Sequence, residues 1–194
     1  SRDLFHVLSA PVGDRESATG ELLGTLDLVT SGDDDPASLL QGHVDVSRVI
    51  ALGHSAGGGT IVSAAKDDRV DGYISMASGV LGMGSANATT TAPPTFVNKP
   101  SFFIAGALDA IISAEESTRP SFEAVPGPSR LWIIDGVGHN GFDDFCTFGN
   151  GSGIIGVALA SGLGPLLEAQ PQLKTLGQDG CIPPAEPVEL GFPI

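Results

Sequence analysis

The sequence predicts an α/β fold: a mostly parallel sheet of about four strands with helices on both faces. The main observation is that apolar, strand-like runs alternate along the chain with segments of helical spacing. The 194 residues fit one domain, because domains usually span about 50 to 250 residues. Hydrophobic residues make up 41% of the chain, which is enough to build a sizeable core.

The N-terminal part predicts a helix followed by a break. Aliphatic residues recur there at helical spacing: Leu22, Leu23, Leu26 and Val29. We therefore expect an amphipathic helix over residues 15–30 that packs on the sheet. The polar run at residues 31–36 ends this helix, and Asp35 is expected to cap a short helix over residues 36–40.

Four apolar runs predict the strands, at residues 46–52, 72–77, 100–105 and 130–135. A helix over residues 56–66 follows the first of them. Residues 79–99 are rich in Gly, Ala, Thr and Pro and predict a long loop at the carboxyl edge of the sheet, where ligands of open α/β sheets bind. Strands that alternate with helices are typical of a parallel sheet.

The motif G-x-S-x-G follows the first strand, at residues 53–57. It is typical of a sharp strand-to-helix turn that holds a serine hydroxyl, here that of Ser55, at the edge of the sheet. Such a turn is strained, and Gly53 and Gly57 are expected to approach neighbouring elements too closely to carry a side chain. Ser55 is therefore a candidate nucleophile. The alternative is a serine that only caps the following helix.

Two more strand ends carry polar residues of the required kind. The run at residues 102–109 ends in Asp109, and the run at residues 131–139 ends in the glycine-flanked His139. Ser, Asp, His is the chain order of one class of hydrolase triad. His139 suits the general base because histidine titrates near neutrality, and Asp109 would orient its imidazole. Three other acids near the histidine are alternatives to Asp109: Asp135, Asp143 and Asp144.

Three segments carry a resemblance to a known family: GHSAGG at 53–58, AGALDAI at 105–111 and GVGHNGFDDFC at 136–146. The chain resembles the α/β-hydrolase superfamily over about residues 15–181. More narrowly, it is similar to bacterial serine esterases of the dienelactone hydrolase, chlorophyllase and platelet-activating-factor acetylhydrolase type, and to cutinase-like enzymes. The resemblance implies hydrolysis of short to medium acyl esters through an acyl-enzyme, without cofactor or metal. Acyl transfer or peptide cleavage on the same triad is the alternative.

The backbone N–H of Ala56, the residue after the nucleophile, is expected to bind the oxyanion. The family usually supplies a second donor from an early His-Gly type loop that follows several strands. Only 54 residues precede Ser55, and we find neither the strands nor the loop in them. We therefore expect a single domain over residues 1–194 that is incomplete at both ends. A non-catalytic hydrolase fragment, or a chain whose sheet edge is covered by a companion segment or a second copy, is the alternative from another class.

Substrate contacts are predicted for three residues: His54, Phe142 and Met83. For His54 a position behind Ser55 is favoured over a role as the base, because adjacent residues on a tight turn point apart. Met76 and Trp132 are further candidates for an acyl or alcohol pocket, although each is equally plausible as core packing. No metal-ligand pattern emerges from the sequence.

The two cysteines, Cys146 and Cys181, resemble the cysteine pair near the C-terminus of secreted relatives, and this resemblance implies a disulfide. Two separate buried thiols are the alternative. A bond closing a loop of about 35 residues stabilises by roughly 3 to 4 kcal/mol on the chain-entropy model. It would place the protein in an oxidising compartment, so we expect a secreted or periplasmic location.

Charge and hydropathy exclude two classes of partner. The formal net charge is −14 with only nine Lys and Arg, so no basic stripe is available for nucleic-acid phosphates. No apolar run reaches the roughly 20 residues that span a bilayer. The nearest, at residues 153–167, is interrupted by glycines and is expected to be a buried or substrate-side segment. The expected partner is a small-molecule ester.

Overall fold

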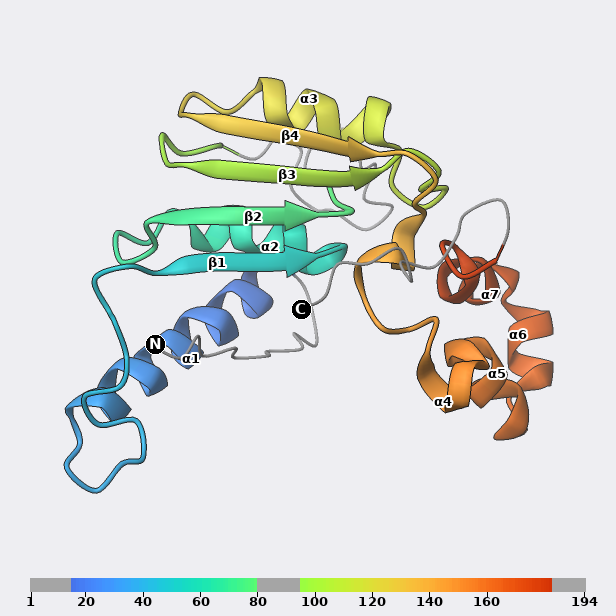
Figure 1. Cartoon of the computed structure of the whole chain (residues 1–194), viewed down its shortest axis with the longest axis horizontal. Coiled ribbons are helices and arrows are strands. Elements are labelled where there is room, and N and C mark those ends of the chain that lie inside the picture. Colours follow the sequence, from blue (N-terminus) through green and yellow to red (C-terminus); the bar gives the residue numbers. More distant parts are fainter. Residues whose placement is uncertain (1–14, 80–94, 183–194) are drawn as a thin grey trace.

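The computed structural model describes residues 15–79 and 95–182, which form a parallel sheet with helices around it (Figure 1). The strands are β1 (Ile50–His54), β2 (Gly72–Met76), β3 (Ser101–Gly106) and β4 (Ser129–Ile134). They are parallel and lie in the order β1-β2-β3-β4. The predicted parallel α/β sheet is confirmed. All four strands end at one edge, so the turns that follow them share one side of the molecule.

The helical elements fall into two groups. Three helices accompany the sheet: α1 (Arg15–Asp34), α2 (Ala56–Ala64) and α3 (Arg119–Glu123), the last preceded by the π-helical turn η1 (Ala114–Thr118). A 3₁₀ turn η2 (His139–Phe142) leads to four short helices: α4 (Phe148–Gly151), α5 (Gly153–Ala160), α6 (Gly164–Ala169) and α7 (Pro171–Gln178). Figure 1 shows α4 to α7 beyond the carboxyl ends of the strands.

The core lies between one face of the sheet and α1, α2 and α3. Tyr73 and Phe103 project from β2 and β3 onto this face, and their rings meet edge to face with centroids 6.0 Å apart. Ile61 and Val62 of α2 belong to the same buried cluster. Leu22 and Leu26 of α1 pack against it, along with Phe122 of α3. The first helix is thus packed against the core, as expected, but mainly through α2 rather than directly on the strands.

On the second face of the sheet, apolar side chains of the two outer strands, β1 and β4, are half or more exposed. Exposed fractions are 55% for Ile50, 57% for Leu52 and 50% for Trp132. The Trp132 ring meets Phe102 edge to face at 4.7 Å between centroids. Within residues 15–79 and 95–182, α1 to α3 all lie on the opposite face. Helices are expected on both faces of the sheet, and the described residues place them on one face.

The first helix and the loop after it differ from the prediction. Helix α1 continues to Asp34, four residues beyond the predicted end at Thr30. Residues 36–40 form turns, so the predicted short helix there is wrong. Asp35 does bind the backbone, since its Oδ1 accepts the N–H of Ala37 at 2.9 Å. This local side-chain hydrogen bond favours a turn over a helix.

Residues 153–167, expected to be buried or on the substrate side, form α5 and most of α6 on the surface. Ile155 and Leu167 are buried there, but four aliphatic side chains are 39 to 55% exposed: Val157, Leu159, Leu163 and Leu166. The expected burial is wrong because the short helices pack mainly on one another and on α7, although they do lie on the carboxyl side of the strands (Figure 1). Among the helices of the described residues, none combines the length and the apolar character that a bilayer crossing requires.

Candidate active site

Ser55 lies at the sharp turn between β1 and α2 with φ 55° and ψ −122°. This backbone conformation is strained for a residue with a side chain, as expected for a serine held out at a strand-to-helix turn. A Cβ on Gly53 would overlap the backbone carbonyl of Gly57, so the glycine before the serine is required. The side chain of Ser55 is partly exposed, so a ligand can reach it.

The second predicted glycine contact is wrong. A Cβ on Gly57 would meet no other described atom within 4 Å. The close approach occurs one residue later, where a Cβ on Gly58 would lie 2.5 Å from the Cβ of Ser78 and 2.9 Å from Oγ of Ser75. The reason is the phase of α2, because Gly58 faces the strand β2 and the segment after it, whereas Gly57 faces away.

His139 begins η2, after β4, and its imidazole reaches Ser55. The distance from His139 Nε2 to Ser55 Oγ is 2.9 Å. His139 Nδ1 lies 2.9 Å from Asp109 Oδ2, so Nδ1–H donates to the carboxylate and Nε2 accepts from the serine hydroxyl. The histidine side chain is only 1% exposed. The structure therefore brings together Ser55, Asp109 and His139 from three separate strand ends.

Asp109 is held by the backbone that follows it. Its side chain is fully buried. Oδ1 accepts the N–H groups of Ile111 at 2.9 Å and Ile112 at 2.7 Å, which leaves Oδ2 for the imidazole. The three alternative acids are not in this position. Asp135 and Asp144 are exposed, and Asp143 faces another histidine.

That histidine is His54, which lies behind the base. Its Nε2–H donates to the backbone carbonyl of His139 at 2.9 Å, and the two imidazole centroids are 4.9 Å apart. On the other side, His54 Nδ1 lies 3.6 Å from Asp143 Oδ2. Burial lowers the pKa of His54 and raises the pKa of Asp143. The pair therefore favours the uncharged imidazole, and His54 supports the loop that carries His139.

The other residues predicted to contact the substrate lie in different parts of the molecule. Phe142 is half-buried beside His54, with ring centroids 6.4 Å apart. Met83 lies outside the described residues. Met76 ends β2, and its carbonyl accepts the N–H of Ser55 at 2.9 Å. Trp132 lies on the exposed second face of the sheet, so it lines no pocket around Ser55.

Ala56, the predicted oxyanion donor, is the first residue of α2 and is exposed. The first N–H groups of an α-helix have no partner within the helix, and the helix dipole makes that end favourable for negative charge. Ala56 directly follows the serine, and its N–H belongs to the first turn of α2. A helix N-terminus at this position suits an anion formed at Ser55.

Sequence reasoning missed Asp179 at this edge, and it considered Asp143 as a partner of His139 rather than of His54. Asp179, just after α7, accepts backbone N–H groups of His139 and Ala110. No strand-end pattern marks either acid, because each meets its partners across long stretches of chain. The implied disulfide is present: Cys146 and Cys181 are bonded, with their Cα atoms 5.0 Å apart.

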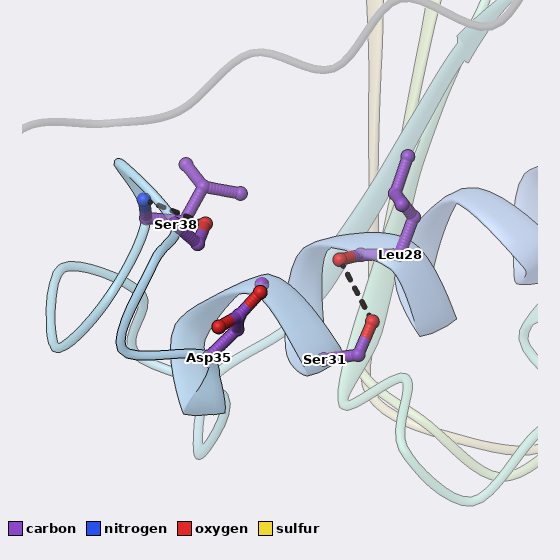
Figure 2. Close-up of a pocket in the computed structure, with 6 residues that line it drawn as sticks. Leu28, Ser31, Asp35 and Ser38 are labelled. Carbon is purple, nitrogen blue, oxygen red and sulfur yellow. Dashed lines mark hydrogen bonds between the residues drawn. The ribbon is translucent and has the colours of Figure 1, made fainter.

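Two surface depressions in the described residues lie away from Ser55. The first, of about 300 Å³, lies between the end of α1 and the loop after it (Figure 2). Its hydroxyls bind nearby backbone: Ser31 Oγ donates to the Leu28 carbonyl, and Ser38 Oγ accepts the Leu40 N–H, both at 3.1 Å. The second, of about 290 Å³, lies beside the disulfide between α5 and α7. Neither is lined by Ser55 or His139.

The sequence matches the family model described as PET hydrolase-like over residues 10–158. The chain belongs to the PET hydrolase-like family. This is an α/β-hydrolase family of ester hydrolases, so the predicted superfamily, fold class and carboxylic ester hydrolase class are confirmed. In this PET hydrolase-like chain the match includes all four strands together with Ser55, Asp109 and His139. No curated protein matches the sequence.

Proposed function

We propose that this PET hydrolase-like chain hydrolyses carboxylic esters with Ser55 as nucleophile, His139 as general base and Asp109 as the orienting acid. The observation that supports this is the continuous hydrogen-bonded chain from Ser55 Oγ through both imidazole nitrogens to Asp109 Oδ2, with 2.9 Å at each step. A strained serine, a buried imidazole and a buried carboxylate at one sheet edge are what acyl transfer requires.

In the first half of the reaction, Ser55 Oγ attacks the ester carbonyl while His139 Nε2 takes the hydroxyl proton. The imidazolium that forms is stabilised by Asp109 through Nδ1–H. Negative charge on the carbonyl oxygen is stabilised by Ala56 N–H at the start of α2. His139 then gives the proton to the departing alcohol, which leaves the acyl group on Ser55.

In the second half, a water molecule donates its proton to His139 and attacks the acyl carbonyl. Collapse of the intermediate returns the proton to Ser55 Oγ and releases the acid. We propose short to medium acyl esters as substrates, with Phe142 and His54 beside the reacting groups. The partial exposure of Ser55 and the exposure of Ala56 support a site that small esters reach directly.

We also propose that the protein works in an oxidising compartment, as a secreted or periplasmic enzyme. The bonded cysteines, Cys146 and Cys181, support this, because disulfides persist mainly in such compartments.

Hydrolysis of p-nitrophenyl acetate and butyrate tests the proposed activity. We expect Ser55→Ala to lose turnover by at least about a thousandfold, because the attacking oxygen is gone. Ser47→Ala is the matched control, since this exposed serine lies before β1 and its hydroxyl donates to the carboxylate of Asp45. A Ser55→Ala variant that hydrolyses both esters as fast as the parent would exclude Ser55 as the nucleophile.

A further inference from the structure

A second carboxylate, that of Asp179, connects the two loops that carry the acid and the base. Its Oδ1 accepts the backbone N–H of His139 at 3.2 Å. Its Oδ2 accepts the backbone N–H of Ala110, the residue after Asp109, at 2.7 Å. One side chain from the end of α7 therefore bonds both to the loop after β3 and to the loop after β4.

The backbone around Asp179 is fixed on the same loop. The carbonyl of Asp179 accepts the N–H of Asn140 at 2.9 Å. In return, Asn140 Nδ2 donates to the carbonyl of Leu176 in α7 at 2.6 Å. Asn140 is almost fully buried, at 2% exposure. The end of α7 and the turn after it are thus hydrogen-bonded to both His139 and Asn140.

Two glycines allow this close approach. A Cβ on Gly138 would lie 2.6 Å from the backbone N of Gly180 and would overlap Oδ1 of Asp179. Gly180 has φ +89°, and a Cβ there would lie 2.9 Å from the backbone N of Gly141. Both positions therefore need glycine, because any side chain would push the Asp179 turn away from the His139 loop.

The disulfide holds the same turn covalently. Cys181 comes two residues after Asp179, and its partner Cys146 comes seven residues after His139. The bond joins the segment that follows the base to the segment that carries Asp179. A turn tethered in this way stays near His139 even though the two lie 40 residues apart in the chain.

We infer that Asp179 is a positioning residue that fixes the distance between the acid loop and the base loop, and so keeps the His139 imidazole in line between Asp109 and Ser55. The inference rests on the proposed function of these three residues. The Asp179 carboxylate bonds to backbone N–H groups rather than to the imidazole ring or the reacting atoms. Its effect is through geometry, since an error of about 1 Å in a catalytic group costs about a hundredfold in rate.

Asp179→Asn is the sharpest variant, because it keeps the size of the side chain but replaces one acceptor oxygen by an NH₂ group. That group cannot accept an N–H, so one of the two bonds, to His139 or to Ala110, is lost. Asp135→Asn is the matched control, since Asp135 is an exposed acid at the end of β4.

The measurement is turnover of p-nitrophenyl butyrate per active site, with sites counted by stoichiometric fluorophosphonate labelling. We expect Asp179→Asn to lower kcat per site by about ten- to a hundredfold with KM within about twofold. We also expect its downfield proton signal from His139 Nδ1–H to weaken or move. Asp135→Asn should match the parent in both readouts.

The inference is overturned if Asp179→Asn turns over at the parental rate per labelled site, even where less folded protein is obtained. If that variant does not fold, Asp179→Glu keeps the charge on a longer side chain, and parental turnover per site in it would overturn the inference equally. Failure of the proposed function looks different, because the parent itself would then take up no label.

Discussion

The carboxyl edge of the sheet and its second face are built from the same four strands, yet they differ in which kind of side chain is buried. At the edge, His139 and Asp109 are polar and are almost completely buried. On the second face, Leu52 and Trp132 are apolar and half or more exposed. At the edge, polar side chains are buried because each is hydrogen-bonded, whereas the apolar side chains of the second face have little packed against them. This difference can be tested by paired substitutions.

The largest effect is expected at the edge. Asp109→Asn should lower kcat for p-nitrophenyl butyrate by about ten-thousandfold, because an amide in place of Oδ2 favours the wrong imidazole tautomer. Asp135→Asn is the control with an exposed acid at a neighbouring strand end. Equal losses in the two variants would mean that the contact between Asp109 and His139 does not serve catalysis.

The two faces of the sheet are compared by removing one aromatic ring from each. Phe103→Ala should lower the free energy of unfolding by about 3 to 5 kcal/mol, since Phe103 is fully buried between β3 and the helices. Trp132→Ala removes a half-exposed ring that meets Phe102, and about 1 kcal/mol is expected. Urea unfolding followed by circular dichroism measures both. A loss at Trp132 as large as that at Phe103 would show that the second face is covered in solution.

The smallest effect is expected from His54, which lies behind His139. It is an effect on folding stability that depends on pH. Burial lowers the pKa of His54 in the folded state, so the unfolded chain binds the proton more readily. Stability is therefore lost as the pH falls below about 6.5, by at most about 1.4 kcal/mol per pH unit. His54→Asn should flatten this dependence in unfolding measured between pH 7 and pH 5.

Asp143 contributes to the pH dependence of stability with the sign opposite to that of His54. Its pKa is raised by burial, so the folded state binds the proton more readily, and its contribution to stability grows as the pH falls through the raised value. Asp143→Asn separates the two groups, because it leaves only the His54 contribution. A His54→Asn variant with the same pH dependence as the parent would contradict the assignment to His54.

Local patterns made most of the site predictable. The strand, glycine and serine of the elbow lie within a few residues, so Ser55 and Gly53 could be identified without knowledge of the fold. Asp109 and His139 could be identified as candidates because each lies in the turn that follows a strand. The motif predicts a close contact at Gly57, but the structure has this contact at Gly58. Which glycine faces the strand depends on how α2 is rotated against β2.

Contacts made across long stretches of chain could not be predicted. Asp179 meets Ala110 and His139 only because α7 returns to the edge of the sheet. Asp143 meets His54 across 89 residues, although it had been considered as a partner of His139. At Asp35 the pattern predicts a helix where the structure has a turn, because an acid followed by a proline suits both. For Asp179 and Asp143, the sequence shows a suitable residue but not its partner.

The most direct test of the central claim is to locate the fluorophosphonate adduct on the intact protein by peptide mass spectrometry. Activation of one serine by the buried histidine predicts about one label per chain, carried by the peptide that contains Ser55, and no label in His139→Gln. Label on another serine, or equal labelling of Ser55 in His139→Gln, would contradict the claim.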